Sequence, residues 1–377
     1  MEEHYIRSGR KLLRCGYTTG TCAALAAGAA AEYLLAGAPP ETASLTTPKG
    51  WAVSVPLAGA ELSEDGQSAR CAVRKDAGDD YDVTDGMLVW AEVRKRSAPG
   101  VSIGGGEGVG RVTRPGLDQP VGAAAINRVP RRMIGEQVRA VCGRLGYDGG
   151  MEITISIPGG EVRAAKTFNP ELGVEGGLSI LGTSGIVEPM SEQAIVDTIA
   201  LQTRQAAVNA KDLILTPGNY GEDFLKSTGL DGLGVPVVKY SNFLGEALDI
   251  AAAEGFERVL LVGHLGKLVK AAGGIMNTHS RYADCRTELF CAHAAVCGAG
   301  AELCRALMDA AATDACIELL DGAGLRRPVL DSLLSAVQRH LERRAAGAYQ
   351  VGAVIFSNAY GPLGQTQQAE KILEGWK

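Results

Sequence analysis

Four apolar segments in the second half of the chain constrain its fold more than any other feature. They begin at Asp212, Val235, Val259 and Val351, and each runs into a glycine-bearing polar loop: DLILTPGNYG, VPVVKYSNFLG, VLLVGHLGK and VGAVIFSNAYG. Their valine, leucine and isoleucine residues do not alternate with polar ones, which is the pattern of parallel strands buried on both faces. Helix-forming stretches lie between them. The sequence therefore predicts an α/β domain with a four-stranded, doubly wound parallel sheet.

The loops that follow these strands are the expected binding surface. In open α/β sheets, ligands bind beyond the carboxyl ends of the strands. The polar and glycine residues of these loops are Pro217, Gly218, Asn219, Tyr220, Gly221, Ser241, Asn242, Gly263, His264, Gly266, Lys267, Ser357, Asn358 and Gly361. Whether His264 is catalytic or structural stays open at this point. Lys239 and Lys270 are interpreted as surface charges.

A second polar segment, Asn277–Glu288, follows the apolar stretch GKLVKAAGGIM. It places His279, Asp284 and Arg286 within a few residues of one another. A polar concentration of this kind, directly after an apolar segment, indicates a site rather than a solvated helix face.

The first half of the chain predicts an α+β domain. Thr18, Thr19, Gly20 and Thr21 precede an alanine-rich run that ends near Leu35. Threonine before a helix-forming run is typical of an N-cap, because its hydroxyl accepts from an unpaired backbone N–H. Two interpretations remain open: an ordinary capped and buried helix, or a helix N-terminus that binds a carboxylate or phosphate.

Short segments with strand character follow this helix. They are residues 43–47, 52–57, 69–75 and 87–96, and glycine, proline and aspartate separate them. A helix is expected from Pro130 to the glycine at 146. Residues 153–157 and 162–167 predict a hairpin, and residues 179–185 predict a further strand.

Two loops in this half have unusual compositions. The segment KDAGDDYDVTDG, residues 75–86, contains five aspartates, and a solvated turn, a cation site and a ligand loop are all open for it. Residues 103–111, IGGGEGVGR, contain five glycines, which permit close approach to a ligand. Neither matches a dinucleotide-binding or P-loop motif.

Composition excludes several classes of protein. The net charge of −6 gives no overall attraction to nucleic acid, and no segment reaches the apolar length of a membrane span. Nine cysteines are an odd number without any CxxC pair, so a reducing cytoplasm is the expected compartment and no protein-bound metal is expected. Homo-oligomerisation stays open.

Eight segments, in the same order, resemble the cobalt-precorrin-5B (C1)-methyltransferase (CbiD) family of anaerobic cobalamin synthesis. They are GYTTGTCAA, KDAGDDYDVT, GGGEGVGRVT, PVGAAAINRVPRRMI, KTFNPELGVEGGLSILGTSGIVEPMS, LTPGNY, SNFLGEALD and GHLGKLVKAAGGIMNTHSRYADCR. The resemblance runs from Arg14 to Asp284 and continues more weakly to Gly361. Tyr81 and Arg128 stand where the family pattern has proline.

The resemblance implies S-adenosylmethionine-dependent methylation of C1 of a cobalt-bearing tetrapyrrole, with the cobalt inside the substrate. It also implies an N-terminal domain like a permuted ribosomal-S5-type fold, residues 1–191, and a parallel α/β domain, residues 192–377. The composition of the chain changes near the same place. The GxGxG loop of ordinary methyltransferases is missing, so the methyl donor is predicted from the resemblance alone.

Residue roles follow from the chemistry of methyl transfer. Alignment of two ligands supplies much of the acceleration, and a base is expected to remove a proton, for which His264 and His279 are the candidates. The methyl donor is expected at Gly218, Asn219, Gly221, Ser241, Asn242, Gly263 and Gly266. The carboxylates of the ring are expected to bind Thr18, Thr19, Gly20 and Thr21 together with Arg111, Arg114, Arg131, Arg132, Lys267 and Arg286.

Two other functions fit parts of the sequence. In a small-molecule kinase, GTCAALAA would hold ATP phosphates and the aspartates near Asp79 would bind magnesium, although the parallel domain would then be unexplained. A tetrapyrrole-binding carrier without catalytic activity fits the carboxylate-binding residues. Binding of adenosylmethionine, of ATP with magnesium, or of neither cofactor distinguishes the three.

Overall fold

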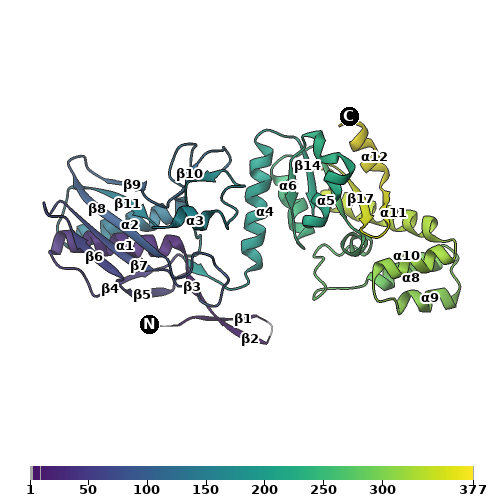
Figure 1. The fold of residues 1–377 in the computed structure, drawn as a ribbon, viewed down its shortest axis with the longest axis horizontal. Coiled ribbons are helices and arrows are strands. Elements are labelled where there is room, and N and C mark those ends of the chain that lie inside the picture. Colours follow the sequence, from purple (N-terminus) through teal and green to yellow (C-terminus); the bar gives the residue numbers. More distant parts are fainter. Residues whose placement is uncertain (1–2, 9, 377) are drawn as a thin grey trace. The chain divides into compact units, whose positions relative to one another are not determined.

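A computed structural model describes residues 3–8 and 10–376 of the chain. The chain folds as two compact units, Met1–Ser191 (unit 1) and Glu192–Lys377 (unit 2) (Figure 1). Among the described residues, no helix is long and apolar enough to cross a membrane.

Unit 1 is built around a five-stranded mixed sheet. Its elements are β1 (Tyr5–Ser8), β2 (Lys11–Arg14), β3 (Gly16–Tyr17), α1 (Thr19–Ala36), β4 (Thr42–Thr46), β5 (Ala52–Pro56), β6 (Gly59–Leu62), β7 (Ser68–Arg74), β8 (Leu88–Arg96), β9 (Val101–Gly105), β10 (Arg111–Val112), α2 (Arg128–Arg144), β11 (Gly150–Ser156), α3 (Gly160–Ala164), β12 (Val174–Glu175) and β13 (Ile186–Val187). The strand order is β6-β7-β8-β11-β9, in which only the β11–β9 pair is parallel. Helices α1 and α2 pack on each other and on this sheet (Figure 1).

Helix α1 forms the buried centre of unit 1. Thr18 caps it, because its hydroxyl accepts a hydrogen bond from the Thr21 amide, as the sequence predicts. Alanine and glycine make up most of its buried residues, so neighbouring elements approach the backbone closely. A Cβ atom added at Gly28 would lie 3.5 Å from Cβ of Gln137 on α2. The helix ends where Gly37 adopts a φ of 81°.

Two predictions for unit 1 are wrong. Residues 153–157 extend β11, but residues 162–167 do not pair with it, because β8 and β9 already occupy both of its edges. Instead α3 follows, and the Glu161 carboxylate accepts a hydrogen bond from the Gly108 amide at 2.7 Å. Residues 179–185 form a loop with one isolated bridge, between Ile180 and Ile126, rather than a strand.

Unit 2 is a three-layer α/β unit. Its elements are α4 (Glu192–Ala207), β14 (Asp212–Thr216), α5 (Asn219–Thr228), η1 (Leu230–Leu233), β15 (Val237–Lys239), α6 (Leu244–Ala253), β16 (Arg258–His264), α7 (Leu265–Leu268), η2 (Val269–Gly273), α8 (Arg286–Val296), α9 (Ala301–Met308), α10 (Thr313–Gly322), α11 (Arg326–Ala345), β17 (Gln350–Ser357), β18 (Gly361–Gln365) and α12 (Gln367–Glu374). The strand order is β15-β14-β16-β17-β18. The predicted strands are the four parallel ones, and the sheet has a fifth, β18, antiparallel to β17.

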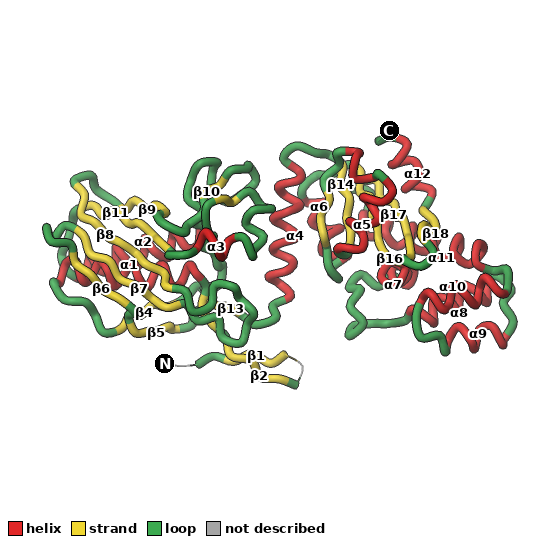
Figure 2. The backbone as a smooth tube through the Cα atoms, viewed as in Figure 1, coloured by secondary structure: helices red, strands yellow, loops and turns green. Residues whose placement is uncertain are grey.

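Helices cover both faces of this sheet (Figure 2). Leu213 and Leu215 of β14 face the core formed with α4, α6 and α11, whereas Ile214 faces the smaller core formed with α5 and α12. In that smaller core Phe224 stacks on Phe356 with ring centroids 4.2 Å apart. Burial on both faces explains why the strand sequences lack alternation.

Candidate functional site

The strand order places a switch point at the carboxyl ends of β14 and β16. The chain leaves β14 toward β15 on one side and returns as β16 on the other side. The two loops that begin there diverge, which is where open α/β sheets bind ligands. We call the residues at this edge, Gly218, Asn242, His264, Lys267, Asp314 and Ser357, the strand-end surface.

His264 ends β16 and caps the short helix α7. Its Nδ1 accepts a hydrogen bond from the Gly266 amide at 3.1 Å, and its ring meets Phe356 edge-on at 5.7 Å. Burial lowers the pKa of His264, and the negative charge of Asp314 opposes this shift. The imidazole is therefore neutral at pH 7 and carries its hydrogen on Nε2, where it acts as a hydrogen-bond donor.

Lys267 reaches from α7 to the end of β15. Its ammonium donates to Oδ1 of Asn242 at 2.5 Å and to the carbonyl of Ser241 at 3.3 Å. Burial, and then the charge of Lys270, lower the pKa of Lys267. The structure thus brings Lys267 to Ser241 and Asn242, two consecutive residues that lie well before it in the sequence.

Ser241 adopts a left-handed backbone conformation with a φ of 55°. This region disfavours residues with a Cβ atom by about 1–2 kcal/mol, and such strain in native structures concentrates at functional sites. We expect Ser241→Gly to raise the free energy of unfolding by about 1 kcal/mol, because glycine removes the Cβ strain. Urea denaturation measures this, and an unchanged or lower midpoint would contradict the strain.

The predicted glycines of the surface differ in their environments. A Cβ atom at Gly221 would lie 1.6 Å from Oγ1 of Thr216, and one at Gly263 would lie 3.0 Å from the side chain of Leu268. Packing alone requires small residues at these positions. Gly218 has no atom within 4 Å of an added Cβ, so it leaves open space for a ligand at the switch point. Asn219 accepts from Lys239 at 3.2 Å.

His279 lies on the segment between η2 and α8, and Arg286 is the first residue of α8. His279 is exposed, and its Nδ1 accepts from the Arg281 amide at 3.1 Å. Arg286 makes a bidentate ion pair with Asp284, with distances of 2.5 and 2.9 Å. A substrate carboxylate at Arg286 therefore has to compete with Asp284.

The sequence does not predict the positions of two polar residues in this region, Asp314 and Lys270. Asp314, in the first turn of α10, accepts a hydrogen bond from Ser357 Oγ at 2.9 Å, so a carboxylate lies at the end of β17. Lys270 is buried, and its interpretation as a surface charge is wrong. No local pattern marks either residue, because their positions depend on contacts between distant segments.

In unit 1, the threonines at the start of α1 bind the 179–185 loop. Thr19 Oγ1 accepts from the Leu181 amide at 3.0 Å and lies 3.2 Å from the Ser179 carbonyl, to which it donates. Thr21 Oγ1 donates to the Gly185 carbonyl at 2.6 Å. The Gly20 amide donates to the Leu181 carbonyl at 3.0 Å. This geometry supports the buried structural helix over an anion site at Thr18–Thr21.

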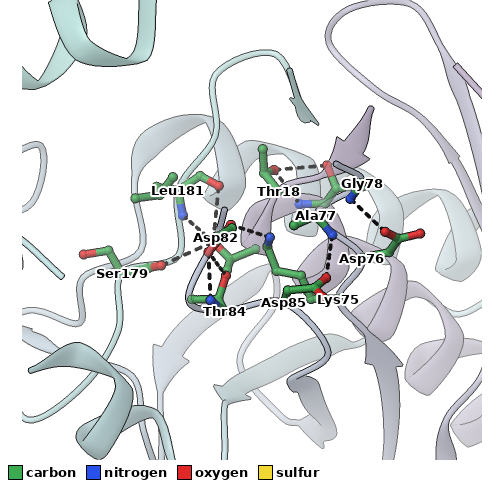
Figure 3. Close-up of polar contacts among 12 residues, drawn as sticks. Thr18, Lys75, Asp76, Ala77, Gly78, Asp82, Thr84, Asp85, Ser179 and Leu181 are labelled. Atoms are coloured by element: carbon green, nitrogen blue, oxygen red, sulfur yellow. Dashed lines mark hydrogen bonds and ion pairs between the residues drawn. The ribbon is translucent and has the colours of Figure 1, made fainter. Parts of the chain in front are cut away.

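The five aspartates of residues 75–86 also make internal contacts. Asp82 accepts from Lys75 and Thr84, and Asp85 accepts from the Ala77 amide (Figure 3). Asp76 pairs with the Arg14 guanidinium, Asp79 accepts from the Arg14 amide, and Asp80 accepts from the Met190 amide. The segment is therefore a hydrogen-bonded scaffold. Among the described residues, no group of three or more His, Cys, Asp or Glu is placed to hold a metal ion. This geometry does not support the magnesium site that a kinase needs.

The predicted arginines of unit 1 contact backbone carbonyls. Arg131 donates to the carbonyls of Ile126 and Ile103, each at 2.9 Å, and burial lowers its pKa. Arg111 is exposed and donates to the Gly122 carbonyl at 3.1 Å. Arg131 thus joins α2 to β9, whereas Arg111 keeps most of its guanidinium accessible.

A cavity beside Arg14, Tyr17 and Asp76 measures about 30 Å³. A water molecule needs roughly 10–15 Å³ of such space, so the cavity has room for water. The strand-end surface of unit 2 remains the better candidate for ligand binding.

Comparison with known proteins decides the family. Two family models match the chain: CbiD over residues 6–189, and the CbiD C-terminal domain over residues 277–367. The chain belongs to the CbiD family. The family predicted from the sequence motifs is thereby confirmed.

Curated CbiD relatives align over nearly the whole chain. A cobalt-precorrin-5B C(1)-methyltransferase of Ruminiclostridium cellulolyticum is 46% identical over 95% of this chain and 92% of its own length. Another of that name, from Alkaliphilus metalliredigens, is 42% identical over 99% and 97%. A crystal structure of a cobalamin biosynthesis protein (cbiD) from Archaeoglobus fulgidus is 29% identical, covers 74% of this chain and 86% of that chain, and has a TM-score of 0.39.

Proposed function

We propose that this CbiD protein transfers a methyl group from S-adenosylmethionine to C1 of cobalt-precorrin-5B, which gives cobalt-precorrin-6A in anaerobic cobalamin synthesis. The observation that carries the proposal is the 46% identity, over 95% of the chain, to a relative named for this reaction. Identity of this extent covers both units and all eight motifs.

The strand-end surface is the proposed site of the methyl donor. Gly218 leaves open space at the switch point, Nε2 of the neutral His264 is a donor, and Asp314 supplies negative charge. These groups suit a ligand with hydroxyls, a purine and a positively charged centre. Adenosylmethionine, when bound, supplies an electrophilic methyl group.

The residues of the surface then act mainly by positioning. Lys267 fixes the end of β15 through Asn242 and Ser241, and its positive charge is available to a substrate carboxylate. Alignment of this kind supplies much of the acceleration of a two-ligand reaction. Nδ1 of His264 accepts from the Gly266 amide, and Nδ1 of His279 accepts from the Arg281 amide, so each ring presents an Nε2–H donor in this arrangement. His264 is the proposed donor to the ligands. His279 is the proposed base, and in that role it has to give up its backbone contact, which its exposed position allows.

Two further proposals concern the fold of unit 1 and the cellular compartment of the protein. We propose that unit 1 is related to the permuted S5-type fold, since two helices pack on its mixed sheet. We also propose a cytoplasmic enzyme, since all nine cysteines are free thiols, which is typical of a reducing compartment.

One experiment tests the reaction directly. Anaerobic incubation with cobalt-precorrin-5B and adenosylmethionine carrying a labelled methyl group is expected to add one label to the ring, as measured by mass spectrometry. Calorimetric titration is expected to show binding of adenosylmethionine and none of ATP with magnesium. Binding of ATP-magnesium with no labelled ring would favour the kinase, and binding of the ring without transfer would favour the carrier.

A further inference from the structure

Lys270 is an unusual residue because its ammonium is buried in unit 2. The residue is 2% exposed, whereas lysine is almost never fully buried without partners. Its Nζ donates to the carbonyls of Thr278 at 3.1 Å and Ala283 at 2.8 Å, and lies 3.8 Å from the Asp284 carboxylate. All of these partners belong to residues 277–285, which we call the wall segment.

The wall segment is also attached to the strand-end surface. The Thr278 amide donates to the carbonyl of Asn242 at 2.9 Å, and Thr278 Oγ1 donates to Oδ1 of Asn242 at 3.3 Å. The same Oδ1 accepts from Lys267 at 2.5 Å. Asn242 therefore contacts Lys267 on one side and the wall segment on the other.

Backbone strain occurs at or close to the residues that the two lysines contact. Lys267 donates to the carbonyl of Ser241, whose φ is 55°. Lys270 contacts Ala283 and Asp284, and the next residue, Cys285, has a φ of 50°. Residues other than glycine adopt this conformation only where surrounding contacts impose it.

We propose that Lys270 is a positioning residue that fixes the wall segment beside Lys267 and Asn242, so that this segment forms one side of the tetrapyrrole site. Lys270 contacts no substrate itself, since its ammonium lies beneath the segment. The wall segment presents His279, Arg281 and Tyr282, whose residues are exposed. Arg281 pairs with the Glu192 carboxylate, and the Tyr282 hydroxyl donates to the same carboxylate at 2.8 Å, so a carboxylate of the polyanionic ring binds Arg281 in competition with Glu192. The inference rests on the proposed function for the identity of the ring.

Limited proteolysis tests the contact without any substrate. Arg281 is an exposed trypsin site within the wall segment. Lys270→Met removes the ammonium and keeps the length of the side chain, and cleavage after Arg281 is expected to be at least about tenfold faster than in wild type. Lys371→Met, an exposed lysine of α12, is the matched control and is expected to be cut at the wild-type rate. Equal rates in Lys270→Met and wild type would overturn the inference.

Kinetics test what the wall segment does. In Lys270→Met the KM for the tetrapyrrole is expected to rise about tenfold while the Kd for adenosylmethionine stays within about twofold. Faster cleavage with an unchanged KM would also overturn the inference, because the segment would then have no part in ring binding. If wild type binds no adenosylmethionine, the proposed function fails, and the cleavage comparison alone decides the inference.

A second variant covers the case in which Lys270→Met does not fold. Asp284→Asn removes the carboxylate that lies 3.8 Å from Lys270 and also pairs with Arg286, and it leaves both carbonyl contacts of Lys270 in place. Cleavage after Arg281 is expected to be about threefold faster in this variant. Arg286→Met, which breaks only the Arg286–Asp284 pair, is the control and is expected to be cut at the wild-type rate. A rate in Asp284→Asn equal to that of wild type would overturn the inference that these contacts fix the wall segment.

Discussion

Lys267→Met is expected to lower kcat/KM for methyl transfer by about 100-fold or more while the melting temperature falls by no more than about 5 °C. A hydrogen bond that involves a charged group contributes about 1.5–3 kcal/mol, and a 100-fold loss corresponds to about 2.7 kcal/mol. Lys267 contacts Asn242 and Ser241 at the end of a neighbouring strand, so its loss disturbs the switch point directly. Steady-state kinetics under anaerobic conditions measure the effect.

Two further variants test whether the loss of activity comes from the positive charge at position 267 or from any lysine-to-methionine substitution. Lys226→Met alters an exposed lysine on α5 and is expected to keep wild-type kinetics. Lys267→Arg keeps the charge and is expected to recover part of the loss. Burial and the charge of Lys270 lower the pKa of Lys267. As pH rises, the activity of wild type is therefore expected to fall at a pH below the one at which an ordinary lysine loses its proton.

Kinetics of Lys267→Met within threefold of wild type would remove Lys267 from the proposed site.

The sequence predicts the parallel strands of unit 2 well for a physical reason. Burial on both faces leaves long apolar runs such as Val259–Val262 of β16, and a run of this kind is visible in any single segment. The edge strand β18 contains two glycines and a proline, so it lacks that signal. Its place in the sheet comes from pairing with β17, which is a contact rather than a local pattern.

The site is harder to predict because hydrogen-bond partners cannot be read from one segment. The threonine hydroxyls of Thr19 and Thr21 have the pattern of an anion site, but the distant 179–185 loop occupies them. Likewise Lys270 has no local mark of burial, since its partners begin at Thr278 and depend on the course of the wall segment. Residue type predicts what a group is able to do, whereas the fold decides which groups remain free.

Substitution of Lys75, the first residue of the hydrogen-bonded segment 75–86 in unit 1, is expected to have a large effect on stability. Its side chain is 2% exposed, and its ammonium lies 2.6 Å from the Asp82 carboxylate (Figure 3). Lys75→Met is expected to lower the free energy of unfolding of unit 1 by about 3 kcal/mol, because removal of one partner leaves a partly buried charge without compensation. Urea denaturation followed by circular dichroism measures this loss.

A double variant distinguishes the lost pair from lost packing. Lys75→Met with Asp82→Asn removes both charges, so it is expected to be more stable than Lys75→Met alone, whereas a packing defect would leave the two equal. The effect of pH gives an independent check. Burial acts to raise the pKa of Asp82, but Lys75 and Thr84 outweigh it and hold the pKa below the ordinary value.

The contribution of this pair is therefore present above the carboxyl pKa of the unfolded chain, about 3.9, and is lost as pH falls through the lower pKa of the folded state. Wild type and Lys75→Met are accordingly expected to differ in stability at pH 7 and to converge in strong acid. A difference that persisted undiminished below the pKa of Asp82 would show that Lys75 stabilises unit 1 through its aliphatic chain rather than through its charge.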